Sequence, residues 1–113
     1  MNTESEVENE IKEKGLTAPR VTPQHIDGVI VDENYHVFEG GQLTICCLTL
    51  QNGFTVSGES ACASPENFDA EIGRKIARKN AREKIWALEG YLLKQLIHQK
   101  QIDELNSVSL SGL

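Results

Sequence analysis

The strongest structural signal in the chain is an apolar stripe with helical spacing that begins after Pro65. Its members recur at three- and four-residue steps: Phe68, Ile72, Ile76, Ala77, Ala81, Ile85, Leu88, Leu92 and Leu96. This spacing places them on one face of an α-helix. Ser64, Pro65 and Glu66 suit a first turn, because they offer a capping hydroxyl, a proline and an acid. We expect a long amphipathic helix from Pro65 to Trp86 or beyond, or a helix pair with its break near Gly90.

A β-hairpin is predicted before this helix. Residues 42–50 and 54–59 carry strand-forming side chains. The Asn52-Gly53 pair between them favours a two-residue type I′ turn, which would place Thr49 opposite Val56. Two earlier runs, at residues 29–31 and 35–38, predict further strands. The fold class that follows is α+β, with a small antiparallel sheet packed against the C-terminal helix or helix pair.

Composition divides the 113 residues into three parts. The sequence of residues 1–27 predicts an N-terminal arm or short helix followed by a linker. The arm or helix is expected where glutamates are frequent, and the linker is expected in the proline-containing stretch after it. We expect residues 28–105 to form a single α+β domain, and the serine-rich sequence of residues 106–113 predicts a flexible tail. One helix covers only one face of the sheet, so a second copy of the chain or the N-terminal segment is expected to cover the other. A chain of this length buries only about two thirds of its unfolded surface, which favours a homo-oligomer.

Several classes of protein are disfavoured by the same sequence. The N-terminus is acidic and no long apolar run occurs, so we expect neither a membrane span nor an ordinary signal peptide. Three cysteines do not make a paired disulfide framework, which indicates a reducing cytoplasm. A net charge of -6 argues against duplex nucleic acid as a partner. We also expect no metal, no cofactor and no enzymatic activity, because no metal spacing or phosphate-binding glycine loop occurs and Cys62 has no histidine near it in sequence.

The charge is distributed unevenly along the predicted helix. Residues 74–84 hold six of the eleven basic residues and one acid, for a net charge of +5, whereas the remainder carries -11. Arg74, Arg78 and Arg82 are spaced by four, so they lie along one helix face, with Trp86 at the next step. Guanidinium groups hold phosphate oxygens bidentately and stack on flat rings, so this ladder could bind a nucleotide. The alternative is a solvated face whose arginines pair with nearby acids, such as those at positions 69 and 71.

Two stretches of the chain resemble a family of small accessory proteins of tailed phages and prophages. The first is Gly15–Pro23, and the second runs from Asn52 to Cys62 and continues through Ser64–Asp69, Ile76-Ala77, Ala81 and Trp86–Tyr91. The resemblance spans roughly residues 15 to 93. It implies a phage setting, and hence the cytoplasm of an infected or lysogenic bacterial host, but no particular activity.

In plan, the chain is also similar to the Thoeris anti-defence type one proteins, which sequester immune signals of the cyclic ADP-ribose type as oligomers. This resemblance implies that Arg78 and Arg82 bind phosphate and that Phe54 stacks on a ring. The complete candidate ligand site is Arg74, Arg78, Arg82, Phe54, Glu59 and Trp86. We therefore expect a non-catalytic homo-oligomer that sequesters a phosphorylated nucleotide-type signal. The alternative is a host-takeover protein that binds an acidic surface of a host protein.

Overall fold

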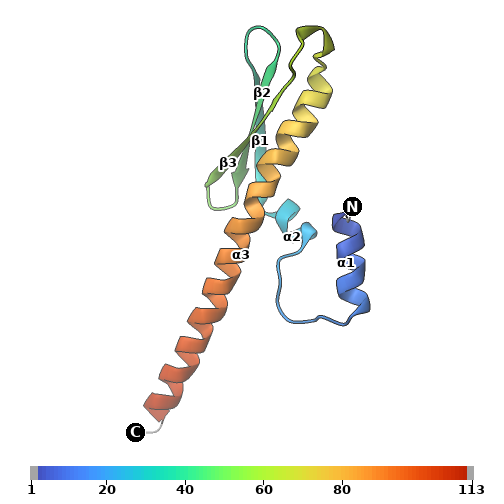
Figure 1. The fold of residues 1–113 in the computed structure, drawn as a ribbon. Helices are drawn as coiled ribbons and strands as arrows, with labels where there is room; N and C mark the ends of the chain where they lie inside the picture. Colours follow the sequence, from blue (N-terminus) through green and yellow to red (C-terminus); the bar gives the residue numbers. More distant parts are fainter. Residues whose placement is uncertain (1–2, 112–113) are drawn as a thin grey trace.

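The structure is a computed structural model that describes the backbone of residues 3–111 and the side chains of residues 3–107. Its elements are α1 (Glu4–Glu13), α2 (Pro23–Gly28), β1 (Ile30–Val37), β2 (Leu43–Leu50), β3 (Thr55–Ala61), the 3₁₀ turn η1 (Pro65–Asn67) and α3 (Ala70–Ser111). The strands form one antiparallel sheet in the order β1-β2-β3, and the first half of α3 packs along one of its faces (Figure 1). This arrangement confirms the predicted α+β fold class.

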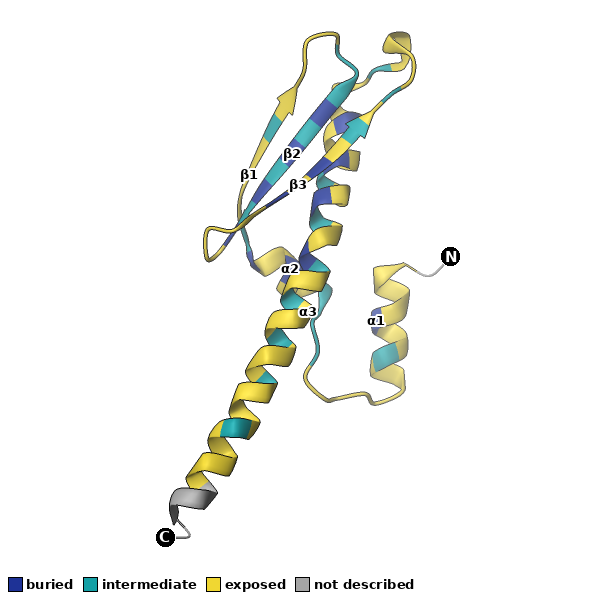
Figure 2. Cartoon of the chain, turned by 60° about the vertical axis from the view of Figure 1, so that its left-hand side comes forward, coloured by how far each residue is buried: buried dark blue, intermediate teal, exposed yellow. Residues whose placement is uncertain are grey.

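The core lies between the sheet and the first half of α3. The buried residues that meet there alternate along the strands and recur at four-residue steps on the helix: Cys46, Leu48, Leu50, Val56, Ala77, Ala81 and Ile85 (Figure 2). Gly58 allows the closest approach, because a Cβ at this position would lie 2.2 Å from the backbone nitrogen of Ala81. Strand β3 therefore packs on the helix backbone itself.

The β2–β3 hairpin has a different register from the predicted one. Leu48 pairs with Val56, where the prediction paired Thr49 with Val56. Residues 51–53 form a three-residue loop closed by two backbone hydrogen bonds of 2.8 Å, and within this loop only Gly53 has a positive φ, of 88°. This geometry is a type I turn followed by a left-handed glycine, so the predicted type I′ turn is wrong. The shift places Val56 on the helix-facing side of the sheet together with Leu48.

Helix α3 is continuous and begins later than predicted. The backbone nitrogen of Ile72 donates to Oδ1 of Asp69 at 3.0 Å, which makes Asp69 the capping residue. Ser64 makes no capping hydrogen bond, and Pro65 opens only the 3₁₀ turn. The predicted start at Pro65 is therefore wrong by about one turn. Gly90 lies inside the helix without interrupting it, so the long helix forms and the helix pair does not.

The second half of α3 projects beyond the sheet and makes the molecule elongated, with extents of 73 × 34 × 19 Å (Figure 1). The helix continues to Ser111, so the described backbone of the predicted tail is helical. Residues 112–113 lie outside the described part, and the mobility of the tail stays a prediction. In the described residues, no helix is long and apolar enough to cross a bilayer.

The N-terminal residues form a capped helix beside α3. Thr3 and Glu6 make a capping box, in which each side chain accepts from the backbone nitrogen of the other residue at 3.2 Å. The chain then passes through the predicted linker to α2, whose N-cap is Thr22. Helix α1 lies away from the sheet, so within the described chain the face opposite α3 stays open (Figure 2). Ile45 and Cys47 on that face are only partly buried.

Candidate functional site

The basic segment, which we define as residues 74–84, lies in the first half of α3. Four of its six cations are exposed, at positions 74, 75, 79 and 84, whereas Arg78 and Arg82 are partly buried. Each of these two arginines contacts carboxylates from other elements of the fold.

Arg82 joins α3 to two other segments of the chain. Both Nη atoms donate to the carboxylate of Glu4 in α1, the Nη2 to Oε1 bond measuring 3.1 Å, and Nε donates to Oδ1 of Asp27 at 2.9 Å. The side chain of Arg82 is only 13% exposed. The hydrogen bond to Glu4 raises the pKa of Arg82, burial opposes this, and the bond to Asp27 raises it further. The site therefore suits a guanidinium that two carboxylates neutralise.

Arg78 is held by the edge strand. Its Nε donates to Oε2 of Glu33 in β1 at 2.7 Å, and this hydrogen bond raises the pKa of the arginine. The pair borders an open hollow of about 340 Å³ that also contains Asp27 and Asp32. Three acids surround one cation there, so an incoming phosphate would meet net negative charge.

A second arginine–glutamate pair fixes the middle of α1 to the linker. The two Nη atoms of Arg20 donate to both oxygens of Glu8, the Nη2 to Oε2 bond measuring 2.9 Å. This bond lowers the pKa of the Glu8 carboxyl. Between α1 and the rest of the chain lies a cavity of about 230 Å³, lined by Thr3, Glu4, Val7, Glu8, Pro23 and Trp86. Helix α1 thus sits over Trp86 without filling the space beneath it.

Three cations of the segment and Trp86 form a line along α3. Lys75, Lys79, Arg82 and Trp86 follow one another at steps of four, three and four residues, which places them on one helix face. We call Lys75, Lys79 and Arg82 the basic ridge. Lys75 makes an exposed pair with Glu71 at 3.2 Å, and Lys79 has no ion pair among the described residues. Two of the three cations on the ridge are therefore exposed, and Lys75 shares its ammonium group with one exposed acid.

The six residues of the predicted ligand site do not lie together. Phe54 follows the hairpin loop at the start of β3, and it is 55% exposed. Glu59 lies on the sheet face away from α3, because it alternates with Gly58, which contacts that helix. Neither residue lines the hollow at Arg78 or the cavity at Trp86. Arg74 is exposed in the first turns of α3.

The carboxylates that bind the arginines could not be found from sequence spacing. Glu4 and Asp27 are 78 and 55 positions from Arg82, and Glu33 is 45 positions from Arg78. The alternative interpretation paired the arginines with the acids at positions 69 and 71, and those partners are wrong. The acid at 69 caps α3, and the acid at 71 pairs with a lysine.

The described part of the chain contains no group of three or more side chains that could hold a metal ion. Cys46 is buried against α3 and burial raises the pKa of its thiol, whereas Cys47 lies on the open face. Cys62 is partly buried and lines a cavity of about 100 Å³ at the start of α3, which also contains Asp69.

Comparison with known proteins places most of this chain in a known family. The model of the phage protein (N4 Gp49/phage Sf6 gene 66) family matches residues 21–97. The matched range contains α2, the whole sheet and the basic segment, and it begins after α1. Searches of curated proteins and of solved structures found no match.

Proposed function

The chain belongs to the phage protein (N4 Gp49/phage Sf6 gene 66) family, and we propose that it is an accessory protein that acts by binding rather than catalysis. Its partner is an acidic surface of a host protein, and the binding surface is the basic segment of α3. This action takes place in the host cytoplasm.

The observation that carries this proposal is that Arg82 already holds two carboxylates from distant parts of the chain. The basic ridge continues from Arg82 through Lys79 and Lys75. Both lysines are exposed, and the pair that Lys75 makes with Glu71 is exposed as well. The rest of the chain is strongly acidic, so a partner with a small acidic patch fits this ridge better than an extended polyanion.

A second candidate is the sequestration of a phosphorylated nucleotide-type signal, of the cyclic ADP-ribose or cyclic oligonucleotide class. It is favoured by the concentration of six cations in eleven positions. It ranks second because Arg78 and Arg82 would have to exchange Glu33 and Glu4 for phosphate. Both candidates are compatible with a homo-oligomer.

Capture from host lysate with three forms of the intact protein tests the first candidate. The wild type is compared with Lys75→Glu/Lys79→Glu and with Lys94→Glu/Lys100→Glu, which makes the same charge change on the projecting half of α3. We expect a salt-sensitive protein partner that the first variant loses and the second retains. A partner that survives the change at positions 75 and 79 would contradict the proposal.

Calorimetry separates the two candidates. Titration of the wild type with cyclic ADP-ribose isomers and cyclic dinucleotides should give no binding heat. Tight binding of one of them, abolished by Arg78→Ala and by Arg82→Ala, would replace the first candidate with the second.

A further inference from the structure

Helix α1 is held on the molecule by charged side chains more than by packing. Within the described chain it makes no extensive contact with another helix or strand. Glu4 binds Arg82, and Glu8 binds Arg20 of the adjoining linker. The space between α1, Pro23 and Trp86 is a cavity of about 230 Å³. An interface of this kind lacks the close apolar packing that fixes an element permanently.

The surface beneath α1 has a definite chemical character. Arg82 supplies a nearly buried cation that binds a carboxylate through both Nη atoms. One turn further along, Trp86 and Pro23 supply an apolar floor opposite Val7. An acid followed three residues later by an apolar side chain therefore matches this surface, and Glu4 and Val7 have that spacing.

The ridge extends further than α1 does. Helices α1 and α3 run in the same direction (Figure 1). Glu4 lies at Arg82, while Val7 lines the cavity at Trp86. Because α1 begins at Glu4, which lies at Arg82, it does not reach Lys79 and Lys75. These lysines lie three and seven residues before Arg82 on α3. A helix longer by about two turns at its N-terminal end would reach both lysines.

We propose that the surface formed by Arg82, Trp86 and Pro23 is the docking site for an acidic amphipathic helix of a partner protein, and that α1 is its internal occupant. The partner helix lies parallel to α3 and displaces α1. It carries an acid at Arg82, an apolar residue at Trp86, and further acids opposite Lys79 and Lys75. This inference rests on the proposed function, for which it specifies the form of the acidic partner. The docking site lies within the residues that match the family model, whereas α1 precedes them.

Two fluorescently labelled peptides serve as probes for the intact protein. The short peptide has the sequence of residues 3–16. The long peptide extends this sequence at its N-terminus so that seven residues precede Glu4. Glutamates stand three and seven positions before Glu4. A third peptide, with glutamines at those two added positions, controls for length. Fluorescence anisotropy gives the affinity of each peptide for each variant.

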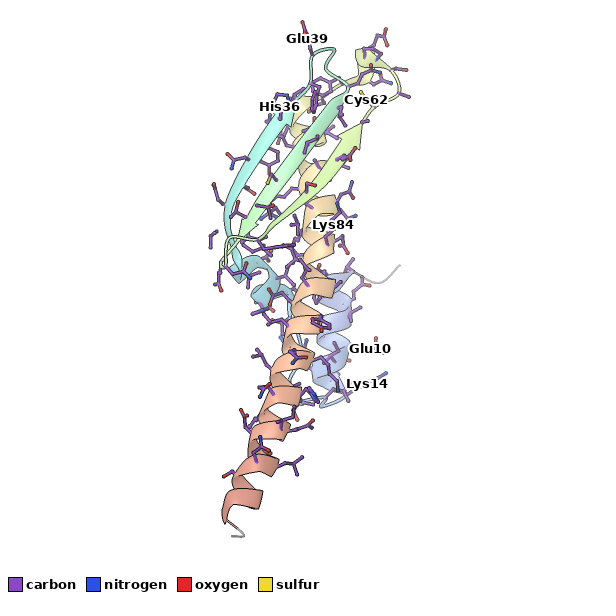
Figure 3. All side chains as sticks on the ribbon, turned by 90° about the vertical axis from the view of Figure 1, so that its left-hand side faces the viewer. Glu10, Lys14, His36, Glu39, Cys62 and Lys84 are labelled. Atoms are coloured by element: carbon purple, nitrogen blue, oxygen red, sulfur yellow. The ribbon has the colours of Figure 1, made fainter. Side chains whose placement is uncertain are left out.

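The variants separate release of α1 from loss of the docking site. Glu4→Gln removes the carboxylate that holds α1 on Arg82, whereas Arg82→Gln removes the site itself. Glu10→Gln is the matched control, because Glu10 pairs with Lys14 at 2.9 Å near the far end of α1 (Figure 3). Lys75→Gln/Lys79→Gln removes only the open part of the ridge.

We expect the Glu4→Gln protein to bind the short peptide more tightly than the wild type, because its own α1 competes less. Glu10→Gln should bind it as the wild type does, and Arg82→Gln should bind it most weakly. The long peptide should bind about threefold to fivefold more tightly than its glutamine control, and Lys75→Gln/Lys79→Gln should lose that gain.

Equal binding by the wild type, Glu4→Gln and Arg82→Gln would overturn the inference, as would the absence of binding in every form. If only the lysine variant weakened the long peptide, the basic segment would remain the binding surface. The docking site beneath α1 would then be excluded, so the failure of this inference is distinguishable from that of the proposed function.

Discussion

At Arg82 one guanidinium group joins the first, second and last helices of the chain. Its carboxylate partners come from Glu4 and Asp27, and no periodic pattern relates these positions to the arginine. Sequence spacing predicted that the arginines of α3 would share a region of the surface. It could not predict their partners, because ion pairs between distant segments depend on the tertiary fold. The two partners also explain why Arg82 is nearly buried although it belongs to a run of charges.

Tyr35 gives a test of side-chain burial on the helix-facing side of β1. Burial, the largest cause, raises its pKa to about 12. Because the folded state favours the neutral phenol, this side chain contributes stability below about pH 10 that is lost as the pH rises toward 12. Ultraviolet difference titration of Tyr91→Phe, which leaves Tyr35 as the only tyrosine, should give a midpoint near 12. A midpoint near 10 would mean that water reaches the hydroxyl.

Gly58 and Gly90 form a matched pair for the packing of β3 on α3. Gly58→Ala places a methyl group against the backbone of α3, and we expect a loss of about 3 kcal/mol or more in the free energy of unfolding. Gly90→Ala meets no atom within 4 Å and should raise that free energy by about 1 kcal/mol. Urea denaturation measures both changes. Equal effects of the two substitutions would refute the close contact at Gly58.

At the scale of elements, periodicity predicted the helix and the sheet but not their exact boundaries. The apolar stripe after Phe68 indicated α3 correctly, because a 3.6-residue period is a property of the whole element. The prediction of the hairpin register was wrong because Asn52-Gly53 suits two turn types. The three-residue loop that forms places Val56 in the core. The predicted helix start was wrong because Ser64 and Asp69 are both residue types that cap helices well, and tertiary packing selects between them.

The two candidate caps can be compared directly. Asp69→Ala removes the acceptor for the backbone nitrogen of Ile72, and we expect it to lower the free energy of unfolding by about 1 kcal/mol. Ser64→Ala should change that free energy by less than about 0.5 kcal/mol, since its side chain makes no capping bond. Thermal and urea unfolding of both variants tests this difference. A larger loss for Ser64→Ala would contradict the observed helix start.

The whole molecule exposes a row of large apolar side chains on the outer half of α3. Leu88, Leu92 and Leu96 follow one another at four-residue steps beyond the sheet and are 38%, 46% and 58% exposed. The open face of the sheet adds half-buried apolar residues. The sequence predicted a long helix, but it did not predict that the second half of α3 would project beyond the sheet. Its outer half keeps helical periodicity, and the linker at Arg20 and Val21 borders it only around a cavity of about 200 Å³ at Leu92 and Leu96.

This exposure predicts self-association through the projecting half of α3. Light scattering should give the wild type a mass above the 12.5 kDa of one chain. Leu92→Lys/Leu96→Lys should lower that mass, because two charges then occupy the stripe. Leu105→Lys is the control, because Leu105 is 69% exposed and lies off the stripe. A wild type that scatters as a single chain would contradict this prediction.

Amide hydrogen exchange in α1 most directly tests the claim that Arg82 binds an acidic helix. Ten residues alone form a helix only marginally in water, so protection of α1 reports its docking on α3. In low salt we predict protected amides in α1. Their exchange should accelerate in about 0.5 M salt and in Glu4→Gln, but not in Glu10→Gln, while core amides of α3 stay unchanged. Exchange rates in α1 that are the same at both salt concentrations and in Glu4→Gln would contradict the account.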